Sequence, residues 1–485
     1  MSRLYNVLLV LISFMILGGA AFYLSNTLYK PAPPVVDRRP AKPNFLILSF
    51  CSLRREHLPI FSEGVAPLPT FKKFFQESLI FRNAINGLPW SNITNYIDVP
   101  AMRARGYQLA RRKSLRIPTV PINKHTPQND ANEKLSWSEA GVRNYELGFS
   151  DGFEQLKHLI LSQGEDPFFI SVHVKYLHFP IIDEVNQKDQ WRRSLPPEWV
   201  KLIDLYVQDP VRYSSKAPLL LTLFSDPAMV QKNPIVRRYV HDFKSVRIGQ
   251  IYQVLSDRDL LKDWQASPGF DTDLKILERA YYLKLQNLDV ALAPILDLYG
   301  NKELRDNTIV VLTGDHGESL MEGGDFLHAN SIDENQIHFP LAVRVPSLGL
   351  TAPRLVDEQY DMAKFDSFLD RVLLSRPEVS KVSTFLTDHD DKVFLRNCAG
   401  TESGIRYRNR YKLVSKVDGV QLFDLREVKE KRVDLKDQLP ELYFELKADL
   451  LNLSALRRNL FACEHPLEPE KMDLPHLRPK PEAEL

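Results

Sequence analysis

The sequence has few cysteines, almost no net charge and no internal repeat. Three cysteines are too few for a fold built on disulfides, although Cys398 and Cys463 could pair with each other in an oxidising compartment. The formal net charge of +1 over 485 residues gives no sign of a polyanionic partner, so nucleic-acid binding is not expected.

The N-terminus carries a long hydrophobic run. Between Leu4 and Leu24 the one strongly polar residue is Asn6, and a helix rising about 1.5 Å per residue would match a hydrocarbon core roughly 30 Å thick. We therefore predict an uncleaved transmembrane anchor over residues 1–28. A cleavable signal peptide is the alternative, because the small residues at 18–21 could serve a peptidase, but the apolar part of such peptides is ordinarily shorter.

A proline-rich linker, residues 29–43, follows the hydrophobic run and is expected to be a stiff spacer. The overall composition, 44% hydrophobic and 26% charged, is that of a globular protein. The length suits one large α/β domain with a smaller C-terminal part, or two ordinary domains. Prolines and charges alternate over residues 464–485, which indicates a solvated tail.

Three short and almost wholly apolar runs predict parallel strands buried on both faces. They are residues 44–50, 168–172 and 308–312. Polar residues follow each run at once, namely Cys51 and Ser52, then His173 and Lys175, then Asp315 and His316. Because ligand sites in open α/β sheets lie beyond the carboxyl ends of the strands, we expect these side chains to meet in one crevice.

The remaining patterns predict the surroundings of the sheet. Apolar residues recur at helical spacing from Leu274 to Ile295, with Pro294 as a bend and Gly300 as a stop, so we expect a helix that covers the sheet. Residues 185–270 show no clear period and are interpreted as an insertion near the mouth of the site. Beyond about residue 353, short strands and turns predict a smaller C-terminal α+β part.

The most specific motif is Thr313-Gly-Asp-His-Gly-Glu318, directly after the third strand. Asp315 and His316 can ligate one divalent ion only if the backbone turns there, and the flanking glycines permit that turn. His328 follows twelve residues after His316. An Asp-His pair alone is more often a surface turn, so the interpretation depends on matches elsewhere in the chain.

Several segments, in chain order, resemble the sulfatases of the alkaline-phosphatase superfamily. Asn44-Phe-Leu-Ile-Leu-Ser-Phe-Cys-Ser-Leu-Arg-Arg-Glu-His-Leu58 resembles the strand that leads to their acidic metal ligand, and Phe81-Arg-Asn-Ala84 with Pro89-Trp-Ser91 resembles the segment of their nucleophile. Residues 172–180 resemble the strand end with a substrate-side histidine, residues 306–340 the metal-binding end of the fold, and residues 404–425 its C-terminal strands.

The resemblance covers about residues 43–450, and its order makes it more specific than any single motif. It implies an α/β fold with an alkaline-phosphatase-like, mostly parallel sheet flanked by helices. It also implies a sulfatase-like catalytic domain over residues 44–352 and a C-terminal sulfatase-like subdomain over residues 353–463.

The resemblance also implies a role for each motif residue. The implied metal ligands are Cys51, Ser91, Asp315 and His316. The implied catalytic residues are Ser91 as nucleophile, with His178 and His328 facing the ester oxygens, and the implied substrate contacts are Arg54, His173 and Lys175. The chemistry is coherent by itself, because a cation lowers the pKa of a serine hydroxyl while a histidine protonates the leaving alkoxide.

Each of these residues has a structural alternative. Ser91 could be a loop or N-cap serine, His173 a strand-end histidine bonded to backbone, and His178 part of an ordinary turn. Arg54 and Lys175 could lie in ion pairs instead of binding an anion.

Two departures from the sulfatase pattern bear on metal and substrate. Cys51 replaces an acidic ligand, and because a thiolate suits zinc, we favour zinc over manganese, calcium or magnesium. The residues after Ser91 lack the Pro and Arg used for formylglycine formation, so an unmodified serine is expected. A serine alkoxide can be phosphorylated but cannot eliminate sulfate from a geminal diol, which favours phosphate esters.

Two functions remain open. The first is a metal-dependent hydrolase or transferase that acts on a sulfate or phosphate ester of a small molecule, glycan or lipid. A likeness to phosphoethanolamine and phosphoglycerol transferases, in which the spacing from His316 to His328 recurs, would suit an envelope lipid or glycan as acceptor. The second, motivated by Cys51, is a catalytically degenerate relative that binds an envelope glycan, lipid headgroup or partner.

The hydrophobic run predicts a single-pass membrane protein, and the resemblance implies that its catalytic domain is extracytoplasmic. The charges flanking the hydrophobic run count against this orientation, because Arg3 alone precedes the run whereas four basic residues follow it, namely Lys30, Arg38, Arg39 and Lys42. The direction of insertion therefore depends on the resemblance.

Overall fold

The structure is a computed structural model that describes residues 43–63, 67–88, 108–111, 149–161, 168–174, 176–179, 197–209, 211–223, 255, 257–365, 368, 391–398, 400–427 and 432–456. These residues belong to a compact unit that begins at Pro43. The predicted anchor and solvated tail, together with Ser91, Lys175 and Cys463, lie outside the described residues. Among the helices that are described, none combines the length and the apolar character needed to cross a bilayer.

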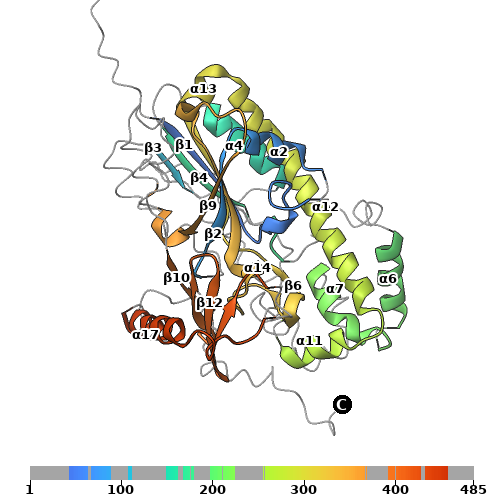
Figure 1. The fold of residues 1–485 in the computed structure, drawn as a ribbon. Helices are drawn as coiled ribbons and strands as arrows, with labels where there is room; N and C mark the ends of the chain where they lie inside the picture. The colour runs from blue at the N-terminus through green and yellow to red at the C-terminus, as the bar shows by residue number, and fades with distance from the viewer. Residues whose placement is uncertain are drawn as a thin grey trace, which may run out of the picture. The chain divides into compact units, whose positions relative to one another are not determined.

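A seven-stranded, mostly parallel sheet forms the centre of this unit (Figure 1), in the order β3-β4-β1-β5-β8-β2-β9. Its strands are β1 (Asn44–Phe50), β2 (Leu79–Ile85), β3 (Gln108–Arg111), β4 (Phe168–Val174), β5 (Thr308–Gly314), β8 (His338–Arg344) and β9 (Arg354–Asp361). Strand β1 pairs in parallel with β4 and β5, whereas β8 runs antiparallel to β5 and β2. The three predicted strands and the mostly parallel sheet are confirmed.

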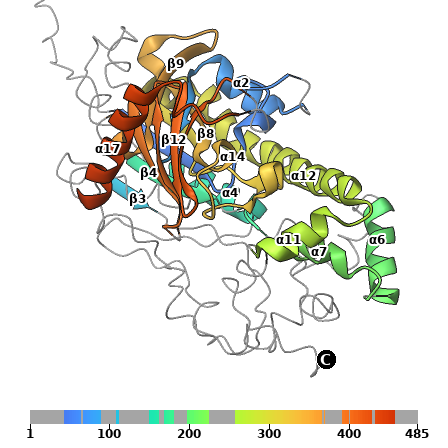
Figure 2. The same ribbon diagram turned by 60° about the horizontal axis from the view of Figure 1, so that its bottom comes forward.

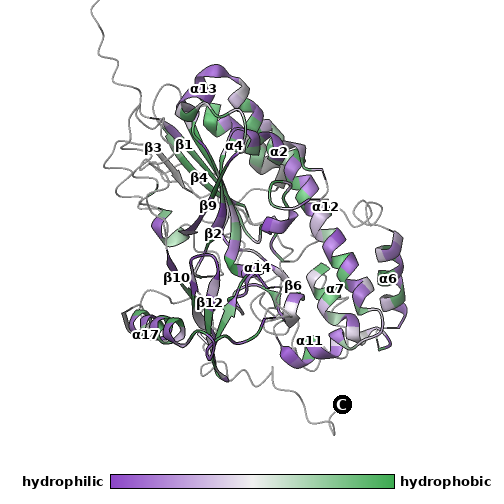
Figure 3. Cartoon of the chain, in the orientation of Figure 1, coloured by the Kyte–Doolittle hydropathy of each residue, from purple (hydrophilic) through white to green (hydrophobic). Residues whose placement is uncertain are grey.

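Strand β1 is buried along its whole length and is apolar except for Asn44 and Ser49, because each of its faces packs into a separate core. Leu46 and Leu48 pack with the helices α2 (Pro69–Gln76), α4 (Phe149–Leu161) and α12 (Phe270–Asp297). Phe45 and Ile47 pack on the other face with residues of β8 and β9. In Figure 3, hydrophobic and hydrophilic residues alternate along α12, as expected for a helix that covers a sheet with one face.

Helix α12 matches the predicted covering helix. Leu277, Leu285 and Ile295 are fully buried, and Pro294 lies inside the helix. A 3-10 turn, η4 (Leu298–Gly300), follows the helix, and α13 (Lys302–Asn307) leads from there into β5. The buried Asp289 of α12 accepts hydrogen bonds from the first turn of α2, which fixes the two helices against each other.

Short helices occupy the described part of the predicted insertion, where the sequence shows no clear period. They are α6 (Pro197–Gln208), η3 (Ser214–Lys216), α7 (Ala217–Leu223) and α11 (Arg258–Gln265). Trp199, Tyr206 and Trp264 pack there with one end of α12 and with the hairpin of β6 (Ser319–Leu320) and β7 (Phe326–Leu327). Each helix is too short for its period to stand out in the sequence, and its stability comes from this apolar packing.

A second sheet contains the four antiparallel strands β10 (Lys392–Arg396), β11 (Ser403–Tyr407), β12 (Tyr411–Lys416) and β13 (Gly419–Asp424). Helix α17 (Pro440–Leu456) covers it (Figure 2), burying Leu446 and Leu450 against Ile405 and Leu413. The sheet connects to the central sheet through Gly87, which follows β2: the N–H of Arg396 donates to the Gly87 carbonyl at 2.8 Å. A Cβ at position 87 would lie 2.1 Å from the carbonyl oxygen of Phe394, so a larger residue would separate the sheets.

Candidate metal centre and active site

Three potential metal ligands meet at the carboxyl ends of β1 and β5. Cys51 directly follows β1, and Asp315 and His316 directly follow β5. Their ligand atoms all lie within 4.8 Å of one another, and the three residues are fully buried. The prediction that these strand ends place Cys51 beside the Asp-His pair therefore agrees with the structure, whereas their role as ligands stays a prediction.

The spacing of the donor atoms fits one small divalent cation. The Sγ of Cys51 lies 3.5 Å from Nε2 of His316, and Oδ2 of Asp315 lies 3.5 Å from the same nitrogen. Tetrahedral zinc, with bonds of about 2.3 Å to sulfur and about 2.0–2.2 Å to nitrogen or oxygen, places its ligands about 3.3–3.6 Å apart. A thiolate, an imidazole and a carboxylate are also donors that zinc accepts, so the residues present suit zinc.

Local hydrogen bonds orient the ligand atoms of His316 and Asp315. The ring N–H at Nδ1 of His316 donates to the Gly317 carbonyl at 2.7 Å, which leaves Nε2 as the ligand nitrogen. Oδ1 of Asp315 accepts the backbone N–H of His316 at 2.8 Å, which leaves Oδ2 for the centre. Burial lowers the pKa of His316, which favours the neutral, ligating form. The side-chain amide of Asn86 donates to the Asp315 carbonyl at 2.6 Å and thereby supports the backbone of the Asp-His pair.

Gly317 is required for close packing behind the ligands. Its backbone N–H donates to the Gln336 carbonyl at 2.9 Å, in the short helix α14 (Glu334–Ile337). A Cβ at this position would lie 1.9 Å from the Asn335 carbonyl oxygen. The motif therefore needs this glycine for space rather than for an unusual backbone angle.

His173 lies inside the protein, beside a ligand. Its Nε2 is 3.4 Å from Oδ2 of Asp315, and its Nδ1 is 3.0 Å from the hydroxyl of Ser49. The residue is 2% exposed, within β4. This position favours orientation of Asp315 over the substrate contact that the resemblance implied.

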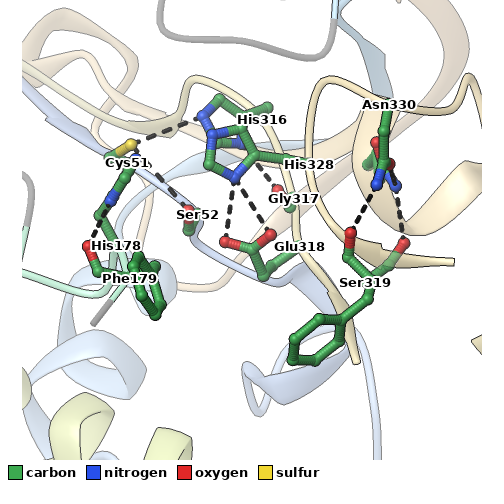
Figure 4. Close-up of polar contacts among 12 residues, drawn as sticks. Cys51, Ser52, His178, Phe179, His316, Gly317, Glu318, Ser319, His328 and Asn330 are labelled. Carbon is green, nitrogen blue, oxygen red and sulfur yellow. Dashed lines mark hydrogen bonds and ion pairs between the residues drawn. The ribbon is translucent and has the colours of Figure 1, made fainter. Parts of the chain in front are cut away.

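His178 and His328 lie together next to His316 (Figure 4). The His328 ring stacks on the His316 ring, with ring centroids 4.0 Å apart. The His178 ring meets the His328 ring edge-on, with centroids 5.1 Å apart. The ring N–H at Nδ1 of His178 donates to the Phe179 carbonyl at 2.7 Å. The segments that follow β4 and β7 thus bring two histidines predicted to face the ester to the side of the predicted metal ligands.

Two polar residues next to these histidines were not predicted as site residues. Both carboxylate oxygens of Glu318 lie 3.1 Å from Nδ1 of His328, and burial raises the pKa of Glu318 to about 7. Ser52, fully buried with a left-handed φ of 59°, hydrogen bonds to Glu318 through its hydroxyl. Glu318 ends the Asp-His motif and Ser52 follows Cys51, so adjacency to the predicted ligands was the available signal.

Arg54 lies in ion pairs. Its Nε is 2.5 Å from Oε1 of Glu56, and its Nη2 contacts Glu322. Burial by itself would lower the pKa of Arg54, but the two carboxylates raise it above its ordinary value. Its backbone N–H donates to the hydroxyl of Tyr281, which in turn donates to the Ser52 carbonyl at 2.7 Å. Of the two alternatives for Arg54, the structure favours the ion pair.

Ser91 and Lys175 lie outside the described residues, so their roles stay predictions.

Comparison with known proteins identifies related sequences. The family model "Sulfatase" matches residues 149–370, a range that includes Asp315, His316 and His328 but neither Cys51 nor Ser91. Arylsulfatase K of Xenopus laevis is 25% identical over 208 residues, and the match covers 39% of this chain and 39% of that protein. The chain thus matches well under half the length of this relative.

Solved structures share the fold over most of their length. The phosphonate monoester hydrolase of Agrobacterium radiobacter superposes with a TM-score of 0.51 at 16% identity, covering 85% of this chain and 96% of its own. A protein solved in complex with its substrate D-glucosamine-2-N,6-O-disulfate superposes with a TM-score of 0.51 at 13% identity, covering 88% and 99%. At these identities the likeness establishes the fold.

Proposed function

Since the sulfatase family model matches residues 149–370, we propose that this chain is a sulfatase-family ester hydrolase that uses a bound divalent cation, with zinc preferred, to cleave a sulfate or phosphate ester. One observation carries the proposal: the thiol of Cys51, the carboxylate of Asp315 and the imidazole of His316 converge within 4.8 Å, and two more histidines lie beside them. A cation there would supply charge neutralisation for the transferred group.

In the proposed reaction the hydroxyl of Ser91 loses its proton, and its Oγ attacks the sulfur or phosphorus atom while the bond to the ester oxygen breaks. Water, or an acceptor alcohol, then cleaves the bond to Oγ and regenerates the serine. Ser91 lies five positions beyond Asn86, whose side chain contacts the carbonyl of Asp315, and five extended residues span roughly 17 Å. The chain is therefore long enough to bring the hydroxyl to the ligands. His178 or His328 then protonates the leaving alkoxide, which suits their position beside His316.

The substrate is proposed to be a sulfated or phosphorylated glycan, lipid or small molecule. Support for a sulfated sugar comes from the relative solved with a disulfated glucosamine, and support for a phosphorus centre comes from the phosphonate monoester hydrolase. The unmodified serine expected at position 91 favours the phosphorus centre. Transfer to an acceptor alcohol in place of water is the corresponding transferase reaction, and product analysis separates the two.

The test is turnover by the purified full-length chain with added zinc, offered matched aryl phosphate, aryl phosphonate and aryl sulfate esters. Wild type should cleave at least one of them, and Ser91→Ala should lose this activity. Ser347→Ala, an exposed serine in the 3-10 turn η6 (Pro346–Leu348), is the matched control and should keep it. Equal turnover by wild type and Ser91→Ala would reject Ser91 as the nucleophile.

A catalytically degenerate binding protein is the second candidate. Cys51 in place of an acidic ligand favours it, as does a family match that does not reach Cys51 or Ser91. Metal analysis separates the candidates: a chain that retains no cation under reducing conditions cannot run the proposed reaction, whereas one bound equivalent of zinc counts against degeneracy.

Membrane attachment through Leu4–Leu24, with the active site outside the cytoplasm, is proposed from the sequence. The apolar run supports the attachment, and the family resemblance supports the orientation. Protease added to intact cells should shorten the chain if the domain is exported. Protection until the membrane is opened would reverse the orientation.

A further inference from the structure

We infer that Arg55 binds an oxyanion, and that this anion is a second charged group of the substrate. The second part rests on the proposed function, whereas the first depends only on the contacts of Arg55. This arginine is not among the predicted site residues, and the proposed reaction gives it no role.

The guanidinium of Arg55 is partly buried and lacks a counter-ion. Arg55 opens the 3-10 turn η1 (Arg55–His57), four residues beyond Cys51. Its Cζ lies 4.9 Å from the centre of the Phe61 ring, which covers one face of the guanidinium. Its Nε is buried without a hydrogen-bond partner, and within the described part of the chain its two Nη atoms have none either. Because an unpaired charge is costly to bury, this arrangement indicates an anionic ligand.

The carboxylates near this guanidinium are already held by other cations. Oε1 of Glu56 lies 2.5 Å from Nε of Arg54. The two carboxylate oxygens of Glu334 lie 3.0 Å from Nε of Arg406 and 3.0 Å from Nζ of Lys412. The charge of each carboxylate is therefore largely neutralised by these partners.

Two more arginines make the surroundings of Arg55 positive. Burial lowers the pKa of Arg55, and the charges of Arg82 and Arg406 lower it further. The nearby carboxylates act in the opposite direction without restoring the ordinary pKa. An anion beside these like charges would reduce their repulsion. The planar guanidinium presents pairs of N–H groups that match two oxygens of a sulfate, phosphate or carboxylate, so the expected ligand is an oxyanion.

Arg55 lies in the segment that leaves the carboxyl end of β1. Cys51 begins this segment, and the four chain steps to Arg55 span at most roughly 14 Å. The arginine is partly exposed, and its Nη atoms are not buried as Nε is, so a ligand can reach them from solvent. A substrate with two anionic groups can therefore place one at the predicted metal ligands and the other at Arg55.

Inorganic sulfate tests the binding site without any turnover. The full-length proteins wild type, Arg55→Met and Arg212→Met are unfolded by heat at rising sulfate concentration, with the ionic strength kept constant by chloride. Methionine keeps an unbranched apolar side chain over Phe61. Arg212 is the matched control, because it also lies over an aromatic ring, 5.9 Å from that of Tyr213, but is exposed. Sulfate stabilises folded proteins in general, so the readout is the additional rise in melting temperature from a bound ion.

Wild type and Arg212→Met should show the same sulfate-dependent rise in melting temperature, and Arg55→Met a smaller one. Equal rises in the three proteins would mean that Arg55 only stacks on Phe61, which would overturn the inference.

Kinetics test whether the anion belongs to the substrate. The substrates are matched aryl esters that carry, or lack, a second sulfate group on a flexible tether of graded length. For at least one tether, wild type should show a KM about tenfold lower than for the ester without the second sulfate, because a hydrogen-bonded charge pair is added. Arg55→Met should lose this difference in KM, and Arg212→Met should keep it. The same difference in Arg55→Met, or none in wild type, would overturn the substrate assignment.

Failure of the proposed function gives a different result. If wild type cleaves none of the esters, the proposed hydrolase is rejected, and the assignment of the anion to a substrate is rejected with it. The sulfate titration still decides whether Arg55 binds an oxyanion.

Discussion

The Sγ of Cys51 and the Nε2 of His316 lie 3.5 Å apart although they are 265 positions apart in the chain. The parallel pairing of β1 with β5 produces this proximity, because it places the residues after the two strands at the same edge of the sheet. The chain thereby combines a sulfur donor with the Asp-His pair.

Cys51→Ser should weaken zinc binding by more than about a hundredfold, because it removes an anionic soft ligand. Elemental analysis and cobalt substitution measure this change, since the thiolate-to-cobalt absorption of wild type should disappear. Cys51→Asp should restore oxygen ligation and shift the preference toward calcium, magnesium or manganese. Equal zinc affinity in wild type and Cys51→Ser would show that Cys51 is not a ligand.

Gly317→Ala should destabilise the fold by about 1–3 kcal/mol or more, because the new methyl group would overlap the Asn335 carbonyl of α14. Thermal unfolding measures the loss. Gly300→Ala is the matched control, since a Cβ there meets nothing within 4 Å, and it should be neutral or stabilising by roughly 0.4–1 kcal/mol. Similar melting temperatures for the two variants would contradict the packing argument.

His57 should make the protein sensitive to acid. Burial, aided by the charge of Arg54, lowers the pKa of His57 to about 3, against an unfolded value of about 6.5. Because the folded state holds the neutral ring, this stabilisation is complete above pH ~6.5 and is lost as the pH falls toward ~3, at about 1.4 kcal/mol per unit.

His57→Phe should therefore reduce the loss of stability in acid, since phenylalanine keeps the ring contacts with Tyr281 and Tyr282 but takes up no proton. Denaturant unfolding at a series of pH values compares the two proteins. Parallel profiles between pH ~6.5 and ~4 would mean that His57 is not the group responsible.

Arg54→Met separates the two roles considered for this arginine. If the guanidinium serves its ion pairs with Glu56 and Glu322, the free energy of unfolding should fall by about 3 kcal/mol, the lower end for buried pairs because both carboxylates are partly exposed. KM should then change little in the folded fraction. A stable variant with a strongly raised KM would instead assign Arg54 to the substrate.

The sequence predicted the part of the fold that local patterns determine. Almost wholly apolar runs identified β1, β4 and β5, and helical spacing identified α12, because burial on one or two faces leaves a direct trace in residue order. The helices α6, α7 and α11 were not predicted. They are stabilised by packing Trp199 and Trp264 into a shared core, which no short window of sequence reveals.

The part of the site that lies at the ends of the strands was predictable from the sequence. Cys51, Asp315 and His316 met as expected because the parallel topology follows from the strands themselves. The roles of His173 and Arg54 depended on side-chain partners, and their partners Asp315 and Glu322 are distant in sequence. Glu318 was part of the quoted motif, but its contact with His328 requires the turn at residues 327–329.

The hydrogen bonds from Arg396 to Gly87 and from Cys398 to Ala329 tie the end of β10 to two segments that flank the site. A fragment cut after β9 would retain Cys51, Asp315 and His316, yet Gly87 and the loop of His328 would lose these hydrogen bonds. For the proposed reaction, the minimal active unit should therefore extend through β10–β13, and mutations in that sheet should impair turnover without changing a predicted ligand.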